Sequence, residues 1–376
     1  MATLDCGSRS VDGHRDKLSF TFCAADAPLI ADYGAPGRLS KIVDYYSSTL
    51  AHNTVMVDGN SQQPSEPCES AHHYQGEFLH CAEATAEDVY PGVAHTRRIM
   101  LVGGVMLVID DITSHQAHDY DWLVRCEGAP ELVGDFQSVE SIFEDIEHVR
   151  IDRCLRASDS FRLNWRCETT DLAFALWNSA GKCTVGIGDC PAENARGRAS
   201  FLLCRTHARD VRFTAALVPS SSSDGLELTK RGGLIRVTDG SRADYILLRQ
   251  DGAAEENQAV QTDGRMAAVS IQGGRIVRAA LGYGSWIKWH GEMLMECSSP
   301  ANCVEISFEN RGPHIRYCSD TAGAIRLKTS CRAIRINGCC VIATTSDGQA
   351  VLRVTPEMLA KLSTFRPFFS LFLENR

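Results

Sequence analysis

Two histidines and one aspartate near the start of the chain have the residue types and spacing of a metal site. His14 precedes one predicted strand, Asp32 follows the next, and His52 precedes a third, at similar separations along the chain. Antiparallel neighbours of this length bring their ends together at one edge of a sheet. Two imidazoles and one carboxylate are a donor set that suits zinc. The sequence therefore predicts a zinc site with His14, Asp32 and His52 as ligands, and with Asp16 as a second carboxylate that orients a ligand imidazole.

The same residues also fit a second metal chemistry. His14 and Asp16, separated by one residue, form with a distant histidine the facial triad of non-haem iron oxygenases. The third ligand would then be His52, His95 or His118. A non-haem iron oxygenase that uses His14 and Asp16 therefore stays open as an alternative.

The elements that must position these residues are predicted to be strands. Short apolar runs alternate with turn residues almost throughout, and Asn337-Gly338 and Asp347-Gly348 are strong hairpin signals. Residues 355–362 give the best helix signal.

These patterns predict an all-β fold with two domains. The first is an antiparallel β-sandwich of two packed sheets over residues 1–260, and the second is a smaller β-sandwich over residues 261–376. The boundary is placed at a polar stretch, residues 251–263, which has the composition of a linker.

Composition excludes several classes of partner. The chain has 44% hydrophobic and 23% charged residues and a net charge of -9, which argues against nucleic acid as a partner. No run approaches the roughly 18 apolar residues of a membrane span, and no signal peptide is visible at Met1. If Met1 is the true start we expect a cytoplasmic protein, and a periplasmic one fits if the sequence is truncated. The sixteen cysteines are interpreted as buried thiols, with a disulfide framework as the lesser alternative.

Three sequence blocks around the predicted metal ligands resemble one known family. Residues 13–20 (GHRDKLSF), residues 32–34 (DYG) and residues 48–62 (STLAHNTVMVDGNSQ) are similar to the C-terminal β-sandwich of the heparinase II/III-like polysaccharide lyases, which include alginate and heparin lyases. A weaker likeness continues through residues 97–99 and 105–111.

The resemblance implies a reaction, a cofactor and a substrate class. Members of the family carry out β-elimination on uronic acid-containing polysaccharides, so an acidic polysaccharide or oligosaccharide is the expected partner. Residues that match His14, Asp32 and His52 hold a structural zinc in the family. In the family, the loop that carries the residues matching Tyr45, Tyr46 and Asn53 faces the cleft, which implies that these residues contact the substrate. Arg97 is expected to contact the carboxylates of uronate units through its planar guanidinium group.

Two departures from the family pattern bear on activity. Asp12 stands where the family has a catalytic histidine, and a carboxylate is far more acidic than an imidazole. The family also places a helical toroid before this domain, whereas twelve residues precede Gly13 in this sequence. We expect a fragment of a longer protein, a chain that works with a separate helical domain or subunit, or an impaired enzyme. The stand-alone chain is expected to be inactive or weakly active as a carbon–oxygen lyase.

A non-catalytic protein is the alternative from another class. The same sandwich, stabilised by zinc, would then bind an acidic glycan or a helical partner across the face that carries Asp12, Tyr45 and Arg97.

Overall fold

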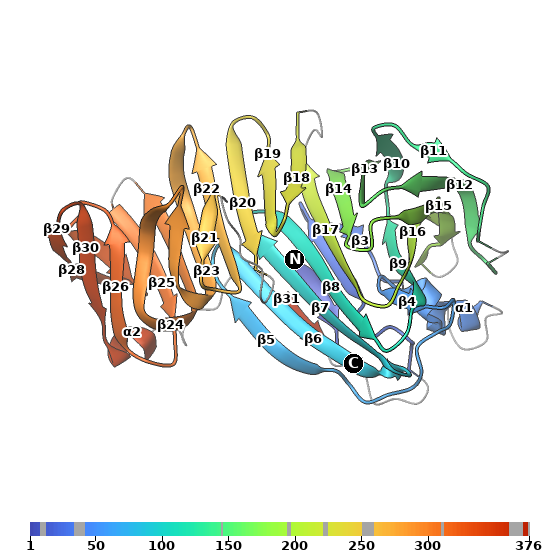
Figure 1. The fold of residues 1–376 in the computed structure, drawn as a ribbon, viewed down its shortest axis with the longest axis horizontal. Helices are drawn as coiled ribbons and strands as arrows, with labels where there is room; N and C mark the ends of the chain where they lie inside the picture. The colour runs from blue at the N-terminus through green and yellow to red at the C-terminus, as the bar shows by residue number, and fades with distance from the viewer. Residues whose placement is uncertain are drawn as a thin grey trace. The chain divides into compact units, whose positions relative to one another are not determined.

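The computed structural model describes residues 1–7, 13–33, 42–143, 146–193, 197–220, 225–249, 259–309, 312–360 and 371–374. Within these ranges β-strands are by far the commonest regular structure, which confirms the predicted all-β class (Figure 1). The described helices are α1 (Val43–Ser47), a 3-10 turn at Thr49–Ala51, and α2 (Pro356–Ala360) inside the predicted 355–362 segment. None of them is long and apolar enough to cross a membrane.

The first of two compact units comprises Met1–His73, Cys81–Ser223 and Phe369–Arg376 and is built on three sheets. The largest sheet has the strand order β10 (Ala129–Val133), β13 (Ser160–Arg166), β14 (Asp171–Asn178), β17 (Val211–Ser220), β8 (Val105–Ser114), β7 (Val93–Val102), β6 (Leu79–Tyr90) and β5 (Glu69–Gln75). The second has the order β11 (Gln137–Ser138), β12 (Arg150–Ala157), β15 (Cys183–Pro191), β16 (Arg198–Ala208), β9 (His118–Cys126) and β4 (Val55–Val57). The third has the order β3 (Ala27–Ile30), β2 (Phe20–Ala24), β1 (Ala2–Asp5) and β31 (Leu371–Glu374).

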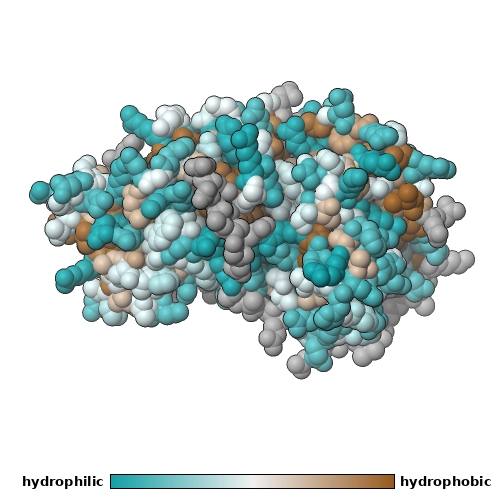
Figure 2. Space-filling model, viewed as in Figure 1, coloured by the Kyte–Doolittle hydropathy of each residue, from teal (hydrophilic) through white to brown (hydrophobic). Residues whose placement is uncertain are grey.

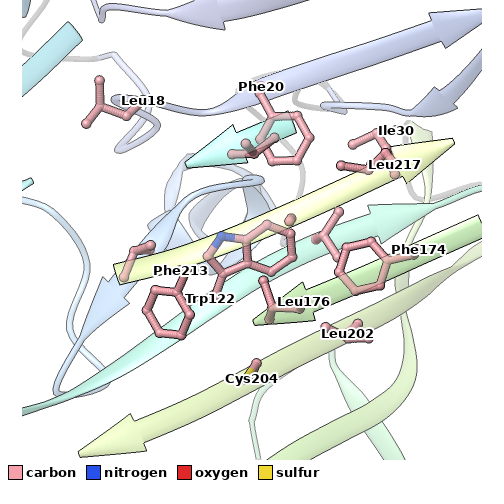
Figure 3. Close-up of a cluster of buried hydrophobic side chains, with 14 of the residues drawn as sticks. Leu18, Phe20, Ile30, Trp122, Phe174, Leu176, Leu202, Cys204, Phe213 and Leu217 are labelled. Carbon is pink, nitrogen blue, oxygen red and sulfur yellow. The ribbon is translucent and has the colours of Figure 1, made fainter. Parts of the chain in front are cut away.

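The main core of this unit contains apolar side chains from both the eight-stranded and the six-stranded sheet. The ring of Trp122, on β9, lies 5.8 Å from that of Phe174 on β14 and 6.2 Å from that of Phe20 on β2 (Figure 3). Leu202 and Cys204, on β16, join the same cluster. Full burial of a large apolar side chain contributes about 1.5–3 kcal/mol, so this cluster accounts for much of the packing energy that holds the sandwich together.

The six-stranded sheet is apolar on its second face as well. Leu203 and Phe201 alternate with the core residues of β16 and belong to a separate buried cluster that includes Tyr45 and Tyr46 of α1. Successive side chains of a strand point to opposite faces, so α1 and its neighbours cover the face turned away from the main core. On the side drawn in Figure 2, hydrophilic residues predominate and apolar ones form small scattered groups.

The second unit comprises Tyr74–His80 and Asp224–Phe368 and contains one branched sheet. Its main path is β18 (Glu227–Arg231), β19 (Leu234–Thr238), β20 (Arg242–Leu248), β22 (Met266–Gln272), β23 (Arg275–Trp289), β24 (Glu292–Glu309), β25 (Gly312–Cys318), β27 (Ala333–Ile336) and β28 (Cys339–Ile342). Off this path lie β21 (Val260–Thr262), β26 (Gly323–Lys328), β29 (Thr344–Ser346) and β30 (Gln349–Val354). Strand β24 pairs with β25 through residues 303–309 and with β26 through residues 295–297, so the sheet branches around its own apolar core.

Both predicted hairpin turns of this unit are confirmed. Asn337 and Gly338 join β27 to β28 with φ angles of +48° and +79°. Asp347 and Gly348 join β29 to β30 with φ angles of +51° and +73°. Two-residue hairpin loops of this type need positive φ at both positions, which Asn, Asp and Gly tolerate best.

The division between the units lies at Ser223 and Asp224, whereas the sequence placed it near residue 260. Strand β20 pairs with β22 from Arg242 opposite Gln272 to Leu248 opposite Met266, across the predicted boundary. The strands before residue 250 therefore share a sheet with those after it. Polar composition marks exposure to solvent, and it does not separate a linker from a connection inside a domain.

Glu305 anchors the short segment Tyr74–His80 in the second unit. Its buried carboxylate accepts hydrogen bonds from the backbone N–H groups of Glu77, Phe78 and Leu79 at 2.8, 3.0 and 2.6 Å. A Cβ at Gly76 would meet Glu305 Oε1 at 2.0 Å, so only glycine fits there.

His80 ends this segment and is buried as a neutral imidazole. It is 5% exposed, and its Nδ1 has no hydrogen-bond partner among the described atoms. Burial, with a smaller contribution from the charge of Arg316, lowers the pKa of His80 to about 4.

The lowered pKa of His80 predicts a loss of stability in mild acid. Between the unfolded pKa near 6.5 and the folded pKa near 4, the unfolded chain binds a proton that the folded chain does not, so stability falls as pH falls through this window. The loss reaches about 3 kcal/mol at most, since one pKa unit corresponds to about 1.4 kcal/mol. Urea unfolding at pH 7 and pH 5 should show a smaller difference for His80→Gln than for the wild type. The exposed neighbour His73, changed to Gln, serves as the control, and equal pH dependence of both variants would contradict the assignment.

Candidate metal centre

The predicted metal ligands lie at the ends of short elements of the first unit. His14 and Asp16 lie in the loop that leads to β2, and Asp32 follows β3, which pairs with β2. His52 follows the 3-10 turn Thr49–Ala51, where its extended backbone ends that turn. The β2–β3 hairpin and the 3-10 turn thus bring together residues that are far apart in the sequence.

Three side chains form a compact donor group. One potential ligand atom from each of His14, Asp16 and His52 lies within 4.8 Å of the others. The ring centroids of His14 and His52 are 5.2 Å apart. His52 is 1% exposed and the other two are half-buried, so the group is partly accessible to solvent.

Asp32 contacts His52 on one ring nitrogen. Its Oδ1 lies 2.7 Å from His52 Nδ1, and its Oδ2 accepts a hydrogen bond from Ser19 Oγ at 2.6 Å. Burial lowers the pKa of His52, but the charge of Asp32 and its hydrogen bond outweigh burial and raise that pKa. His52 Nε2 is buried and has no hydrogen-bond partner among the described atoms. An unsatisfied buried nitrogen is costly, which makes Nε2 the atom best suited to ligate a cation.

This arrangement differs from the predicted one in the roles of the two carboxylates. The sequence assigned Asp32 as a ligand and Asp16 as the orienting group. In the structure Asp16 lies in the compact donor group. Asp32, which was expected to be a ligand beside His52, instead lies within hydrogen-bond distance of the His52 imidazole. Asp12, the predicted stand-in for a catalytic histidine, lies outside the described residues.

Three histidines, His52, His95 and His118, were proposed as the third ligand of an iron triad. Within the described part of the chain, only His52 lies in the donor group with His14 and Asp16. His95 is buried with its Nε2 2.6 Å from Asp110. His118 Nδ1 lies 2.6 Å from Asp58.

The structure corrects the predicted substrate contacts of Arg97 and Asn53. Both are 0% exposed. Asn53 Nδ2 donates to the carbonyl oxygens of Phe20 and Ala31 at 3.0 and 2.8 Å, and its Oδ1 accepts from the backbone N–H of Arg125 at 2.9 Å. Arg97 is paired with Asp110 inside the sandwich. Polar side chains whose hydrogen bonds are all made inside the protein hold the fold together and do not face a polysaccharide.

Tyr45 and Tyr46 are also buried. They are 6% and 1% exposed, and Tyr46 donates its hydroxyl proton to the Ala192 carbonyl. Their apolar cluster covers the second face of the six-stranded sheet. Adjacent tyrosines in a short helix gave no signal that distinguished a core position from a binding surface.

Arg125 is a residue of this region that sequence reasoning missed. It is fully buried, donates to the Leu50 carbonyl, and its guanidinium Cζ lies 5.3 Å from the ring centre of Phe201. Against burial, which raises it, the pKa of Asp32 is lowered mainly by His52 and by hydrogen bonds, with a smaller contribution from the charge of Arg125, and the same charge partly opposes the rise in the pKa of His52. An arginine within the apolar run of β9 was the available signal, because charged residues in such runs are paired or functional.

Residues 2–186 match the family described as Heparinase II/III-like, C-terminal. These residues belong to that family. The match includes the loop of His14 and Asp16, the end of β3 at Asp32, and His52, so the donor group lies within the family domain.

Individual relatives of this chain include enzymes that are much longer. An alginate lyase from Stenotrophomonas maltophilia (strain K279a) is 27% identical over 278 residues, which cover 63% of this chain and 37% of the lyase. Among solved structures, heparinase III has a TM-score of 0.47 at 10% identity, and the match covers 70% of this chain and 35% of heparinase III. The heparan sulfate lyase HepC from Pedobacter heparinus has a TM-score of 0.46 at 13% identity, with 70% and 36% covered. The chain thus spans little more than a third of the length of these lyases.

The interior hydrogen bonds of Asn53 predict a structural defect when its amide is removed. Asn53→Ala leaves two carbonyl groups and one N–H group of the interior without their partner, and each costs about 1–3 kcal/mol. Urea unfolding should therefore show a loss of about 3 kcal/mol or more. Asn60→Ala, at an exposed asparagine, is the control and should change stability by less than about 0.5 kcal/mol. If Asn53→Ala is as stable as the wild type but no longer binds polysaccharide, Asn53 contacts the substrate, as the sequence predicted.

Proposed function

We propose that this chain is the β-sandwich part of a polysaccharide lyase that acts by β-elimination on uronic acid-containing polysaccharides. The observation that carries the proposal is the family match of residues 2–186, which spans the donor group. The alginate lyase relative supports an acidic polysaccharide as the substrate class.

The reaction sets requirements that this unit meets in part. A base removes the C5 proton of the uronate, its carboxylate must be neutralised as negative charge develops, and the departing glycosidic oxygen takes up a proton. Arg97, Asn53, Tyr45 and Tyr46 are buried and do not supply these groups. Asp12, two residues before His14, is the group we propose as a base on this chain. The groups that neutralise the carboxylate would come from a helical domain or subunit.

The donor group suits a structural zinc. We propose that His14, Asp16 and His52 hold the ion, with His52 ligating through its unpartnered Nε2 while Asp32 fixes the ring through Nδ1. A carboxylate on the second nitrogen of a ligand imidazole sets its tautomer and raises its basicity. When bound, the ion would join the loop of residues 13–16 to the end of the 3-10 turn. The same two-histidine, one-carboxylate set also fits non-haem iron, and the identity of the bound metal separates the two functions.

A non-catalytic role is the second candidate function. It is favoured by the burial of all four residues that were expected to contact substrate. The unit would then bind an acidic glycan, or a helical partner, and stabilise it without turnover.

The metal proposal predicts the zinc content of the protein. Purified protein should carry about one zinc per chain, measured by elemental analysis. His52→Ala and Asp16→Ala should lose it and lower the melting temperature, because the energy of metal binding contributes to folding. Asp32→Asn should keep the ion with affinity reduced about 10–100-fold, and His73→Ala should be unchanged. If Asp32→Asn loses zinc and Asp16→Ala retains it, Asp32 is the ligand and Asp16 the orienting carboxylate. If the purified protein carries iron in place of zinc, the oxygenase alternative is favoured.

The lyase proposal predicts how turnover depends on a helical partner. The chain alone should give no detectable unsaturated product, followed by ultraviolet absorbance on alginate and on heparan sulfate at neutral pH, and Asp12→His alone should not change this. Product should appear when the remainder of the Stenotrophomonas alginate lyase is supplied as a fusion, and Asp12→Ala should remove it. Robust turnover by the isolated chain would contradict the need for a helical partner. A stable fusion that binds substrate without turnover would favour the non-catalytic role.

A further inference from the structure

A polar pocket of about 390 Å³ lies on the six-stranded sheet of the first unit. Arg156, Lys182, Thr184, Arg205, His207 and Ile142 contribute to its lining. Its volume falls within the usual range of small-ligand sites, about 300–1,000 Å³. It shares no residue with the candidate metal centre.

The strand register brings two of its cationic residues, Arg156 and Arg205, into one row. Arg156 on β12 is opposite Thr184 on β15, Thr184 is opposite Arg205 on β16, and Arg205 is opposite Asp121 on β9. Residues directly opposite one another across antiparallel strands project from the same face of a sheet. Two guanidinium groups therefore flank a threonine on one surface.

Arg205 is held rigidly in this row. Its Nε and Nη2 each donate to the buried Asp121 carboxylate at 2.7 Å, and its guanidinium Cζ lies 5.1 Å from the ring centre of Phe143. Its Nη1 has no hydrogen-bond partner within the described residues, and the side chain is 23% exposed. A planar guanidinium fixed on two sides loses little conformational freedom when it binds an oxyanion through its remaining nitrogen.

The other cations of the pocket face solvent. Arg156 and Lys182 are exposed, and the Lys182 carbonyl accepts a hydrogen bond from Thr206 Oγ1 at 2.8 Å, which fixes its backbone. His207 Nδ1 lies 2.8 Å from Asp119, the acidic member of the lining. Ile142 is 51% exposed and adds an apolar surface at the rim. The pocket thus brings together three cationic side chains, Arg156, Lys182 and Arg205, and the charge of Arg205 is paired with that of Asp121.

We propose that this pocket binds an oxyanion-bearing sugar unit of an acidic polysaccharide, through Arg156, Lys182 and Arg205, at a subsite separate from the metal centre. The choice of a sugar as the carrier of the oxyanion rests on the proposed function. Arg205 and Arg156 would contact the carboxylate or sulfate, Thr184 a hydroxyl group, and Ile142 the apolar edge of the ring. Such a subsite would give this unit its own affinity for the polysaccharide.

The test is calorimetric titration of the isolated chain with three probes. They are an unsulfated alginate tetrasaccharide, a heparan sulfate tetrasaccharide, and neutral cellotetraose. Arg156→Gln and Lys182→Gln should each weaken binding of an acidic probe about fivefold, and the double variant about tenfold or more. Arg153→Gln, an exposed arginine on the same strand outside the pocket, is the matched control and should bind like the wild type.

Each outcome decides for or against the pocket. Binding of the alginate probe identifies the carboxylate as the recognised group, and binding of the sulfated probe alone identifies the sulfate. Equal affinity of the double variant and the wild type, equal weakening by Arg153→Gln, or binding of neither acidic probe would overturn the inference. The proposed function is judged separately by turnover of the alginate lyase fusion. If the fusion forms product but the double variant binds the probes like the wild type, the pocket proposal is wrong and the lyase proposal stands. If the double variant binds more weakly but the fusion forms no product, the lyase proposal is wrong and the pocket proposal stands.

Discussion

The buried ion pair between Arg97 and Asp110 is the interaction on which the first unit depends. Arg97 Nε and Nη2 donate to the Asp110 carboxylate at 2.6 and 2.9 Å, and Trp122 of the other sheet donates to it at 2.8 Å. Arg97 Nη1 donates to the carbonyl oxygens of Leu18 and Asn53, both at 2.6 Å. A buried charge is tolerated only when its partners are all in place, and removing one partner costs about 3–5 kcal/mol. Two sheets and two loops are therefore fixed at a single point.

The candidate metal centre is tied to this point by hydrogen bonds. The Asn53 N–H donates to Ser19 Oγ at 3.0 Å, Ser19 donates to Asp32, and Asp32 holds His52. The orientation of the imidazole is thus set by hydrogen bonds within the protein. A site that is preorganised in this way gains affinity because little freedom is lost on binding.

The residues around the candidate metal centre could be predicted from the sequence only in part. The resemblance located His14, Asp32 and His52, and the structure places all three within one small region. Whether Asp16 or Asp32 joins the donor group depends on how the loop of residues 13–19 lies against the end of the β2–β3 hairpin. The spacing of residues along the sequence does not predict this arrangement. Arg97 was expected to contact uronate carboxylates, whereas its partner is Asp110 on the neighbouring strand. Only strand pairing shows that the two are buried together.

The sequence by itself determined the all-β class, the family of residues 2–186 and both hairpin turns, and it identified the residues of the candidate metal centre. These features depend on local patterns, because alternation of apolar residues and positive-φ turn residues act over a few positions. The tertiary structure alone decided the division near Ser223, the burial of Tyr45 and Asn53, and the row of Arg156 and Arg205. Each of these arises from strands that pair across long separations in sequence, where the register sets which side chains share a face and which are removed from water.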